Sequence, residues 1–197
     1  IYGAYGGFFI LVENKQSLIE GIEMADSLCV DPHKGLFLPY GLGAVIIKDR
    51  EAVYQTHHYR ANYMQDAVSD EVEWSPADLS PELTKHFRGL RMWLPMQLMG
   101  LAPFRAALEE KALLCRYFYQ EAGKAGFELG PEPELSIMIF RYRPAEGDSN
   151  RFNEQLLEYV RRDGRVFLSS TAINGDYWIR LAVLNFRSHL REIRLCI

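Results

Sequence analysis

One lysine, Lys34, lies in the stretch of the sequence whose residue types best suit covalent chemistry. It ends the run Asp31-Pro32-His33-Lys34, which follows the apolar residues 27–30 and precedes a glycine-punctuated loop, 35–43. Apolar and glycine neighbours disfavour the ammonium form of a lysine, which lowers its pKa and leaves a neutral amine able to attack a carbonyl carbon. The pattern therefore predicts a poorly solvated, nucleophilic Lys34. The alternative is a surface lysine on a tight turn.

The tetrapeptide Asp31-Pro32-His33-Lys34 resembles the Schiff-base lysine motif of the group II pyridoxal-phosphate-dependent amino acid decarboxylases. This family includes the aromatic amino acid, glutamate and cysteine-sulfinate decarboxylases. The resemblance implies a carboxy-lyase of amino acid (carboxylic acid) metabolism that binds pyridoxal 5′-phosphate covalently through Lys34, with His33 and Asp31 beside the cofactor. It also implies a homodimer, because the active site of this family lies at a dimer interface.

The segment Ala4-Tyr5-Gly6-Gly7 resembles the strand end that follows the cofactor-binding aspartate of the family, which places Ala4 at the cofactor. Tyr2 stands where that aspartate is expected. A carboxylate keeps the pyridine nitrogen protonated and makes the ring an electron sink, whereas a tyrosine, with a reference pKa of about 10, stays neutral. Either Tyr2 is a true substitution that impairs activity, or residues 1–3 are a terminal artefact.

Two further residues are candidates for the reaction itself. Tyr63-Met64-Gln65-Asp66 resembles the mobile catalytic loop whose tyrosine reprotonates the substrate carbon after carbon dioxide leaves, so Tyr63 is the predicted acid; the alternative is a tyrosine that only packs the loop. The run 178–187 resembles the small-domain strand whose arginine faces the active site. Strand alternation turns Arg180 away from its apolar neighbours, where it can pair with a substrate carboxylate. An exposed strand arginine is the alternative.

The elements that must position these residues follow an α/β pattern. Strands through Cys29 and Ile46, apolar on both faces, predict a sheet covered by helices on both sides. The polar and aromatic stretch 50–80 has no clear periodicity and is typical of a mobile lid. The other predicted elements are helices near 15–24, within 81–125 with a break around Gly100, over 151–162 and after 188, and strands at 135–142, 166–170 and 177–185.

With the resemblance, this order implies the C-terminal portion of a fold-type I pyridoxal-phosphate-dependent transferase. Residues 1–103 are expected to belong to the large cofactor-binding domain, and residues 104–197 to a linking helix and a small α+β domain. Both ends of the sequence look cut, so we expect a fragment. In the family, the phosphate-binding segment and the histidine stacked on the ring precede the strand with which this sequence opens, and we expect them in the same gene product.

Composition excludes several other classes of protein. The 197 residues carry a formal net charge of −4 without a basic stripe, which argues against a nucleic-acid partner. No apolar run reaches the roughly 18 residues that span a bilayer, so no membrane partner is expected. The three cysteines are widely spaced without a CxxC pair, so neither a disulfide framework nor a metal site is predicted. The start of the sequence lacks signal-peptide features, which predicts a cytoplasmic protein.

The function predicted from these features is pyridoxal-phosphate-dependent decarboxylation of an L-amino acid to an amine. Two alternatives stay open at this point. One is another lyase or an aminotransferase that uses the same cofactor, and the other is an inactive fragment or homologue that lacks the aspartate at the position of Tyr2. The aromatic residues of the loop suggest an aromatic or bulky substrate without excluding an acidic one.

Overall fold

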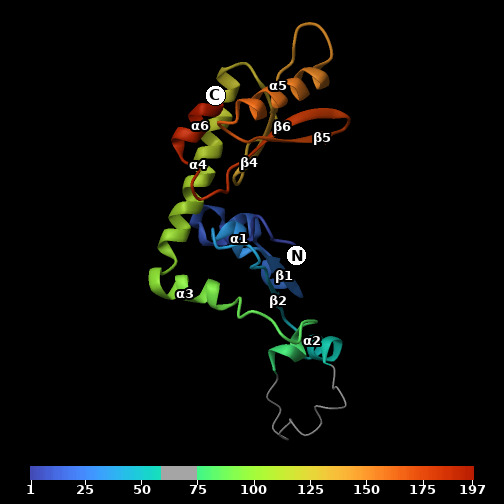
Figure 1. Cartoon of the computed structure of the whole chain (residues 1–197), viewed down its shortest axis with the longest axis vertical. Coiled ribbons are helices and arrows are strands. Elements are labelled where there is room, and N and C mark those ends of the chain that lie inside the picture. The colour runs from blue at the N-terminus through green and yellow to red at the C-terminus, as the bar shows by residue number, and fades with distance from the viewer. Residues whose placement is uncertain (59–74) are drawn as a thin grey trace, which may run out of the picture.

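A long helix, α4 (Ala102–Lys124), connects two parts of the chain in the computed structural model, which describes residues 1–58 and 75–197 (Figure 1). The segment with α1, β1 and β2 lies beside the end of α4 at which the helix begins. A four-stranded sheet with α5 and α6 packs along the rest of the same helix. Helix α4 therefore packs against both parts of the chain.

The lysine segment begins with three short 3-10 helices, η1 (Gly7–Leu11), η2 (Glu13–Ile19) and η3 (Ile22–Met24). The last two, η2 and η3, stand where the sequence predicts one helix near 15–24. The helix is interrupted because Gly21 takes a left-handed φ of 86°, which an α-helix does not tolerate. After η3 the chain enters β1 (Ser27–Val30), and the single turn α1 (Pro32–Gly35) follows immediately.

Strand β1 pairs with β2 (Ala44–Ile47), and both strands lie where the sequence predicts them. The pairing is antiparallel, and Val45 and Ile46 are each 61% exposed. The expected sheet with helices on both faces is therefore not formed by the residues that the structure describes. Sequence periodicity does not distinguish a covered sheet from an exposed one, because a short apolar run shows that a strand is apolar but not what packs against it.

The stretch predicted to be an irregular lid contains two regular elements. Helix α2 (Arg50–His57) starts at Asp49, whose side chain accepts a hydrogen bond from the backbone N–H of Ala52 at 2.9 Å. A 3-10 helix, η5 (Pro76–Leu79), begins at a capping box made by Ser75 and Asp78. Helix α2 escaped prediction because it buries no side chain and so has no apolar stripe. Tyr63 lies outside the described residues.

The predicted break near Gly100 is confirmed. Helix α3 (Leu90–Met99), which includes Pro95, ends at Gly100 with a φ of 70°, and α4 begins two residues later. The residues between 81 and 89, predicted as helical, precede α3 instead of extending it.

The second part is an antiparallel sheet in the order β3-β4-β6-β5. Strands β5 and β6 form a hairpin whose turn, Asn174-Gly175, has positive φ at both residues, 53° and 85°. This turn sets the pairing, so β5 starts three residues later than the sequence predicts. The elements are β3 (Glu128–Leu129), β4 (Ile137–Arg141), α5 (Ser149–Asp163), β5 (Ser169–Ile173), β6 (Asp176–Ala182) and α6 (Leu190–Cys196).

Two apolar cores meet along α4. The larger packs the C-terminal half of this helix against the sheet, α5 and α6, and includes Cys115, Phe118, Phe140, Leu157 and Ile179. The smaller joins Leu108 of α4 to Phe9 and Val12 of the N-terminal segment. The domain boundary predicted at residues 103 and 104 falls inside α4, close to its start, and stays a prediction.

Candidate functional site

Lys34 lies on the one-turn helix α1, directly after β1. Its Nζ donates a hydrogen bond to Oδ2 of Asp31 at 2.6 Å, and its side chain is 39% exposed. This hydrogen bond raises the pKa of Lys34, because the carboxylate stabilises the ammonium form. The prediction of a poorly solvated lysine with a lowered pKa is therefore wrong for this structure. The glycines bend the loop, but the amine itself stays open to solvent and faces a carboxylate three residues earlier.

His33 faces the same carboxylate oxygen of Asp31 as Lys34 does. Its Nδ1 lies 2.8 Å from the carbonyl oxygen of Leu42, which can only accept, so Nδ1 carries the hydrogen. Its Nε2 then faces Oδ2 of Asp31 at 3.8 Å, and its ring packs against Tyr40 at a centroid distance of 5.5 Å. The structure thus brings together three predicted cofactor residues, with Asp31 between the two basic groups.

The segment predicted to lie under the cofactor runs beside β1. Tyr2 forms a parallel bridge with Cys29, and the N–H of Gly3 donates to the carbonyl of Cys29 at 2.7 Å. The side chain of Tyr2 is 81% exposed and contributes, more weakly than Asp31, to the raised pKa of Lys34. Tyr2 is therefore close to the amine, whereas Ala4 is 2% exposed and packed into the protein.

Arg180 lies on β6, away from the lysine turn. Its neighbours Ile179 and Leu181 are buried while Arg180 is half-buried, so the alternation predicted for this strand is confirmed. Its Nη1 donates to Oγ of Ser169 at 3.2 Å, and its charge acts on Tyr5, which follows Ala4. The structure places Arg180 near the segment of Ala4 without joining it directly to Lys34.

Tyr5 is a residue that the sequence reasoning used only as part of a motif. Its hydroxyl shares a hydrogen bond of 2.8 Å with Oγ of Ser136, a fully buried residue just before β4. Burial raises the pKa of Tyr5 to about 12, so the hydroxyl keeps its proton. This bond ties the segment of Ala4 to the sheet that carries Arg180. No local pattern signals a contact between residues so far apart in sequence.

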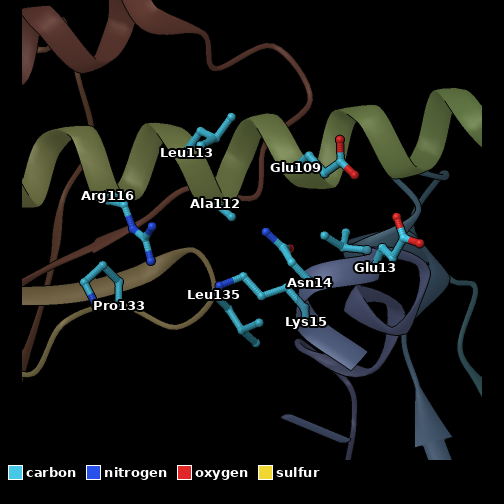
Figure 2. A pocket seen from close by; sticks show the side chains of 10 residues that line it. Glu13, Asn14, Lys15, Glu109, Ala112, Leu113, Arg116, Pro133 and Leu135 are labelled. Carbon is cyan, nitrogen blue, oxygen red and sulfur yellow. The ribbon is translucent and has the colours of Figure 1, made fainter. Parts of the chain in front are cut away.

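A cavity of about 460 Å³ lies between η2, α4 and the segment that leads into β4 (Figure 2). Its wall does not include Lys34, and it mixes charged with apolar side chains. Glu109, Ala112, Leu113 and Arg116 come from α4, Val12, Glu13, Asn14 and Lys15 from the N-terminal segment, and Pro133 and Leu135 from the segment before β4.

Residues 1–58 and 75–197 contain neither a candidate metal site nor a helix that could span a membrane. No group of three histidine, cysteine, aspartate or glutamate side chains is placed to hold a metal ion in this part of the chain. The described helices include none with the length and apolar character to cross a membrane.

Known proteins resemble this chain over most of its length. The pyridoxal-dependent decarboxylase conserved domain matches residues 1–143. The chain belongs to this decarboxylase family. It is 34% identical over 197 residues to an aromatic-L-amino-acid decarboxylase of Bacillus atrophaeus, and the match covers 97% of this chain and 41% of that protein. It is 33% identical over 164 residues to an L-2,4-diaminobutyrate decarboxylase of Acinetobacter baumannii, a match that covers 81% of this chain and 31% of that protein.

Solved structures of the decarboxylase family share the fold. A crystal structure of Oryza sativa TDC with PLP and tryptamine superposes with a TM-score of 0.91 at 22% identity, covering 99% of this chain and 42% of that one. Mouse CSAD gives a TM-score of 0.83 at 22% identity, with 99% and 43% covered. The family and the fold class expected from the lysine motif are therefore confirmed. The chain spans about two fifths of the length of these relatives.

Proposed function

We propose that this chain carries the lysine side of the active site of a pyridoxal-phosphate-dependent decarboxylase that converts an L-amino acid to an amine. The observation that carries the proposal is Lys34, presented on a one-turn helix beside Asp31 and His33 in a chain of the decarboxylase family. Two relatives of this chain are named as decarboxylases of aromatic amino acids and of L-2,4-diaminobutyrate, which supports an amino acid as the substrate.

The residues of the lysine turn fit an aldehyde cofactor. A primary amine is the group that captures an aldehyde, and the amine of Lys34 is held at one side by Asp31 and is 39% exposed. When bound, pyridoxal phosphate supplies an electron-withdrawing ring that accepts the electron pair left behind by carbon dioxide. Lys34 would hold the cofactor, and His33, Asp31 and Ala4 would line its site.

Each proposed role rests on the position or on the chemistry of the side chain concerned. Asp31 orients the amine of Lys34 and keeps its proton until an aldehyde arrives, since Oδ2 lies 2.6 Å from Nζ. Oδ2 is placed to accept a proton released from Nζ, whereas Nε2 of His33, 3.8 Å from Oδ2, lies beyond hydrogen-bond distance. Arg180 would bind the substrate carboxylate through its guanidinium, which suits bidentate pairing. Tyr63 would return a proton to the substrate carbon.

The attachment of the cofactor at Lys34 can be tested in the full-length protein. Borohydride reduction in the presence of pyridoxal phosphate should add the cofactor to the peptide that contains Lys34, as measured by peptide mass spectrometry. Lys34→Ala should lose this adduct and the carbon dioxide release, because no other amine occupies the turn. Lys124→Ala is the matched control, since its side chain is 72% exposed and pairs with Glu121. Adduct formation mainly at another lysine would refute the proposal.

The role of Tyr63 predicts a change of product. Tyr63→Phe should lower amine formation by about 10²- to 10⁴-fold, the usual contribution of a general acid, and increase abnormal transamination of the cofactor. Chromatography of the products distinguishes the two outcomes. Tyr159→Phe, at an exposed position of α5, serves as the control. Unchanged amine formation in Tyr63→Phe would show that this tyrosine only packs the loop.

We also propose a homodimer that works in the cytoplasm. The apolar side chains exposed on α3 and β2, such as Trp93, Leu98 and Ile46, support burial against further protein. Light scattering coupled to size-exclusion chromatography tests the assembly, and a monomeric full-length protein would contradict it.

A further inference from the structure

The backbone that ends the lysine turn has an unusual conformation. Phe37 has a φ of 57°, in the left-handed region that glycine usually occupies at the end of a helix. Its N–H donates to the carbonyl oxygen of Lys34 at 3.3 Å. A bulky residue stays in this region only when its surroundings impose it. The conformation of Phe37 therefore closes the turn that presents Lys34, and something must hold it there.

The holding contacts come from the far end of the chain. The ring of Phe37 packs against Phe186, with the centroids 5.7 Å apart and the planes at 56°. It also joins the smaller apolar core, to which Leu184 contributes. Leu184 and Phe186 follow β6 directly, and β6 carries Arg180. The lysine turn thus touches the segment that leaves the arginine strand.

This segment is itself anchored to α4 by a buried charge. Lys111 on α4 is 0% exposed, and its Nζ donates to the carbonyl oxygens of Phe186 at 3.2 Å and Ser188 at 2.7 Å. The third hydrogen bond goes to Oε2 of Glu110 at 2.8 Å, so every N–H of the ammonium is used. The other carboxylate oxygen of Glu110 lies 2.7 Å from Nδ1 of His189. The backbone around Phe186 is therefore fixed on the helix.

The lysine turn leaves no room for a shift where Gly35 meets Phe8. A Cβ added to Gly35 would meet Cβ of Phe8 at 2.7 Å, closer than real carbon atoms approach. Helix α1 thus packs tightly against η1, and a change at Phe37 must be taken up by the turn itself.

We propose that Phe186, anchored through Lys111 to α4, holds Phe37 in its left-handed conformation and so positions Lys34 relative to Arg180. Phe37 and Phe186 are positioning residues, since neither carries a group that reacts. The functional meaning of this link rests on the proposed decarboxylase site, while the link itself is a property of the fold. Loss of the ring contact lets Phe37 return to negative φ, and the amine of Lys34 then leaves its place beside Asp31.

Hydrogen exchange in the full-length protein without cofactor tests the link. Phe186→Leu should speed exchange of the Phe37 and Leu38 amides by roughly 2- to 10-fold, the range expected when an aromatic pair is lost. The matched control is Phe152→Leu, which removes a ring contact of 5.3 Å with Tyr142, within the sheet-bearing part of the chain. This control should leave both amides unchanged. Equal exchange in Phe186→Leu and the wild type would overturn the proposal.

A double-variant cycle shows whether the contact acts through the backbone of Phe37. The Phe37→Gly variant adopts positive φ readily and has no ring that Phe186 must hold. Adding Phe186→Leu to this variant should therefore change exchange of the Leu38 amide by less than about twofold. A second substitution that keeps its full effect in the glycine background would contradict the proposed mechanism.

The cofactor-loaded protein gives an independent readout. Phe186→Leu should shift the pH at which the absorbance of the bound cofactor changes, and Phe152→Leu should not. If the wild type shows no cofactor absorbance but the exchange results hold, the decarboxylase proposal fails while the link stands. If the wild type binds cofactor and Phe186→Leu alters neither exchange nor the pH midpoint, the link fails while the decarboxylase proposal stands.

Discussion

At the scale of single residues, Asp31 stabilises the protonated form of Lys34. The 2.6 Å hydrogen bond raises the pKa of the amine and so favours the ammonium, a form that cannot attack an aldehyde. The same contact fixes the direction of Nζ. The carboxylate of Asp31 therefore orients the amine of Lys34 and at the same time makes it less nucleophilic.

Asp31→Asn should separate these two effects. Without the carboxylate the pKa of Lys34 falls towards its ordinary value, so the fraction of neutral amine rises at every pH below the wild-type pKa. The initial rate of modification of Lys34 by pyridoxal phosphate, followed by borohydride trapping over a series of pH values, should move to lower pH. Lys124, paired with Glu121, should keep its profile in both proteins. An unmoved profile for Lys34 would show that Asp31 does not govern its protonation.

The sequence predicted the neighbours of Lys34 correctly, but it did not predict the direction in which the pKa of Lys34 is shifted. The tetrapeptide around Lys34 singles out the lysine that we propose to react, and the expected neighbours His33 and Asp31 lie beside it. The direction of its pKa was mispredicted, because apolar and glycine neighbours in sequence do not bury an amine that projects from a one-turn helix. A carboxylate three residues earlier, on the same turn, matters more.

At the scale of elements, a buried arginine joins three strands. Arg141 of β4 is 3% exposed and pairs with Glu128 of β3 at 2.7 Å and Asp176 of β6 at 2.8 Å. Its guanidinium also lies 4.4 Å from the ring centroid of Trp178. Arg143 and Arg141, in that order of strength, hold the pKa of Glu128 down to about 2. The short strand β3 therefore depends on this charge network as well as on its two ladder residues.

Glu128→Gln should destabilise the protein by about 1–2 kcal/mol at neutral pH, a value reduced for the one-third exposure of the side chain. The pKa of Glu128 is lower in the folded state than the ordinary 4.5, so its contribution is present above pH 4.5 and is lost as the pH falls towards 2. Urea unfolding of both proteins over this range checks the prediction. Glu158→Gln, from an exposed pair with Arg162, is the control. A stability difference that stays constant down to pH 2 would contradict it.

The elements themselves were predicted unevenly, for physical reasons. The strands of the hairpin that carries Arg180 were predicted, with β5 placed three residues too early, and the break at Gly100 was predicted at the end of α3. Helix α2 was missed because it is a polar helix, stabilised at its start by Asp49 and not by burial. The exposure of β2 was not predicted, because the sequence of a strand does not show which elements pack against it.

At the scale of the whole molecule, the hydroxyl of Tyr5 joins the N-terminal segment to the distant sheet by hydrogen bonding to Ser136. Tyr5→Phe should cost about 1–2 kcal/mol, because Oγ of the fully buried Ser136 loses its 2.8 Å partner. Adding Ser136→Ala should recover part of that loss, since the unsatisfied hydroxyl is then removed. Tyr159→Phe, at a tyrosine that is 73% exposed, should change the unfolding free energy by less than about 0.5 kcal/mol. Strictly additive effects of Tyr5→Phe and Ser136→Ala in chemical denaturation would show that the two hydroxyls are not coupled.

Contacts at this scale are the part of the site that sequence reasoning could not supply. Tyr5 meets Ser136 and Phe37 meets Phe186 across most of the chain, and no spacing or composition signals either pair. Both depend on how α4 sets the two parts of the molecule against each other (Figure 1).

The contact between Phe37 and Phe186 also sets an order of events during synthesis on the ribosome. The hairpin of β5 and β6 needs only neighbouring residues and closes within about 1–10 μs of its emergence. Lys34 emerges far earlier, yet its turn waits for Phe186 and for the carbonyls that Lys111 binds. The turn of Lys34 is thus made well before the segment that holds it, and it reaches the described conformation only after Phe186 has emerged from the ribosome.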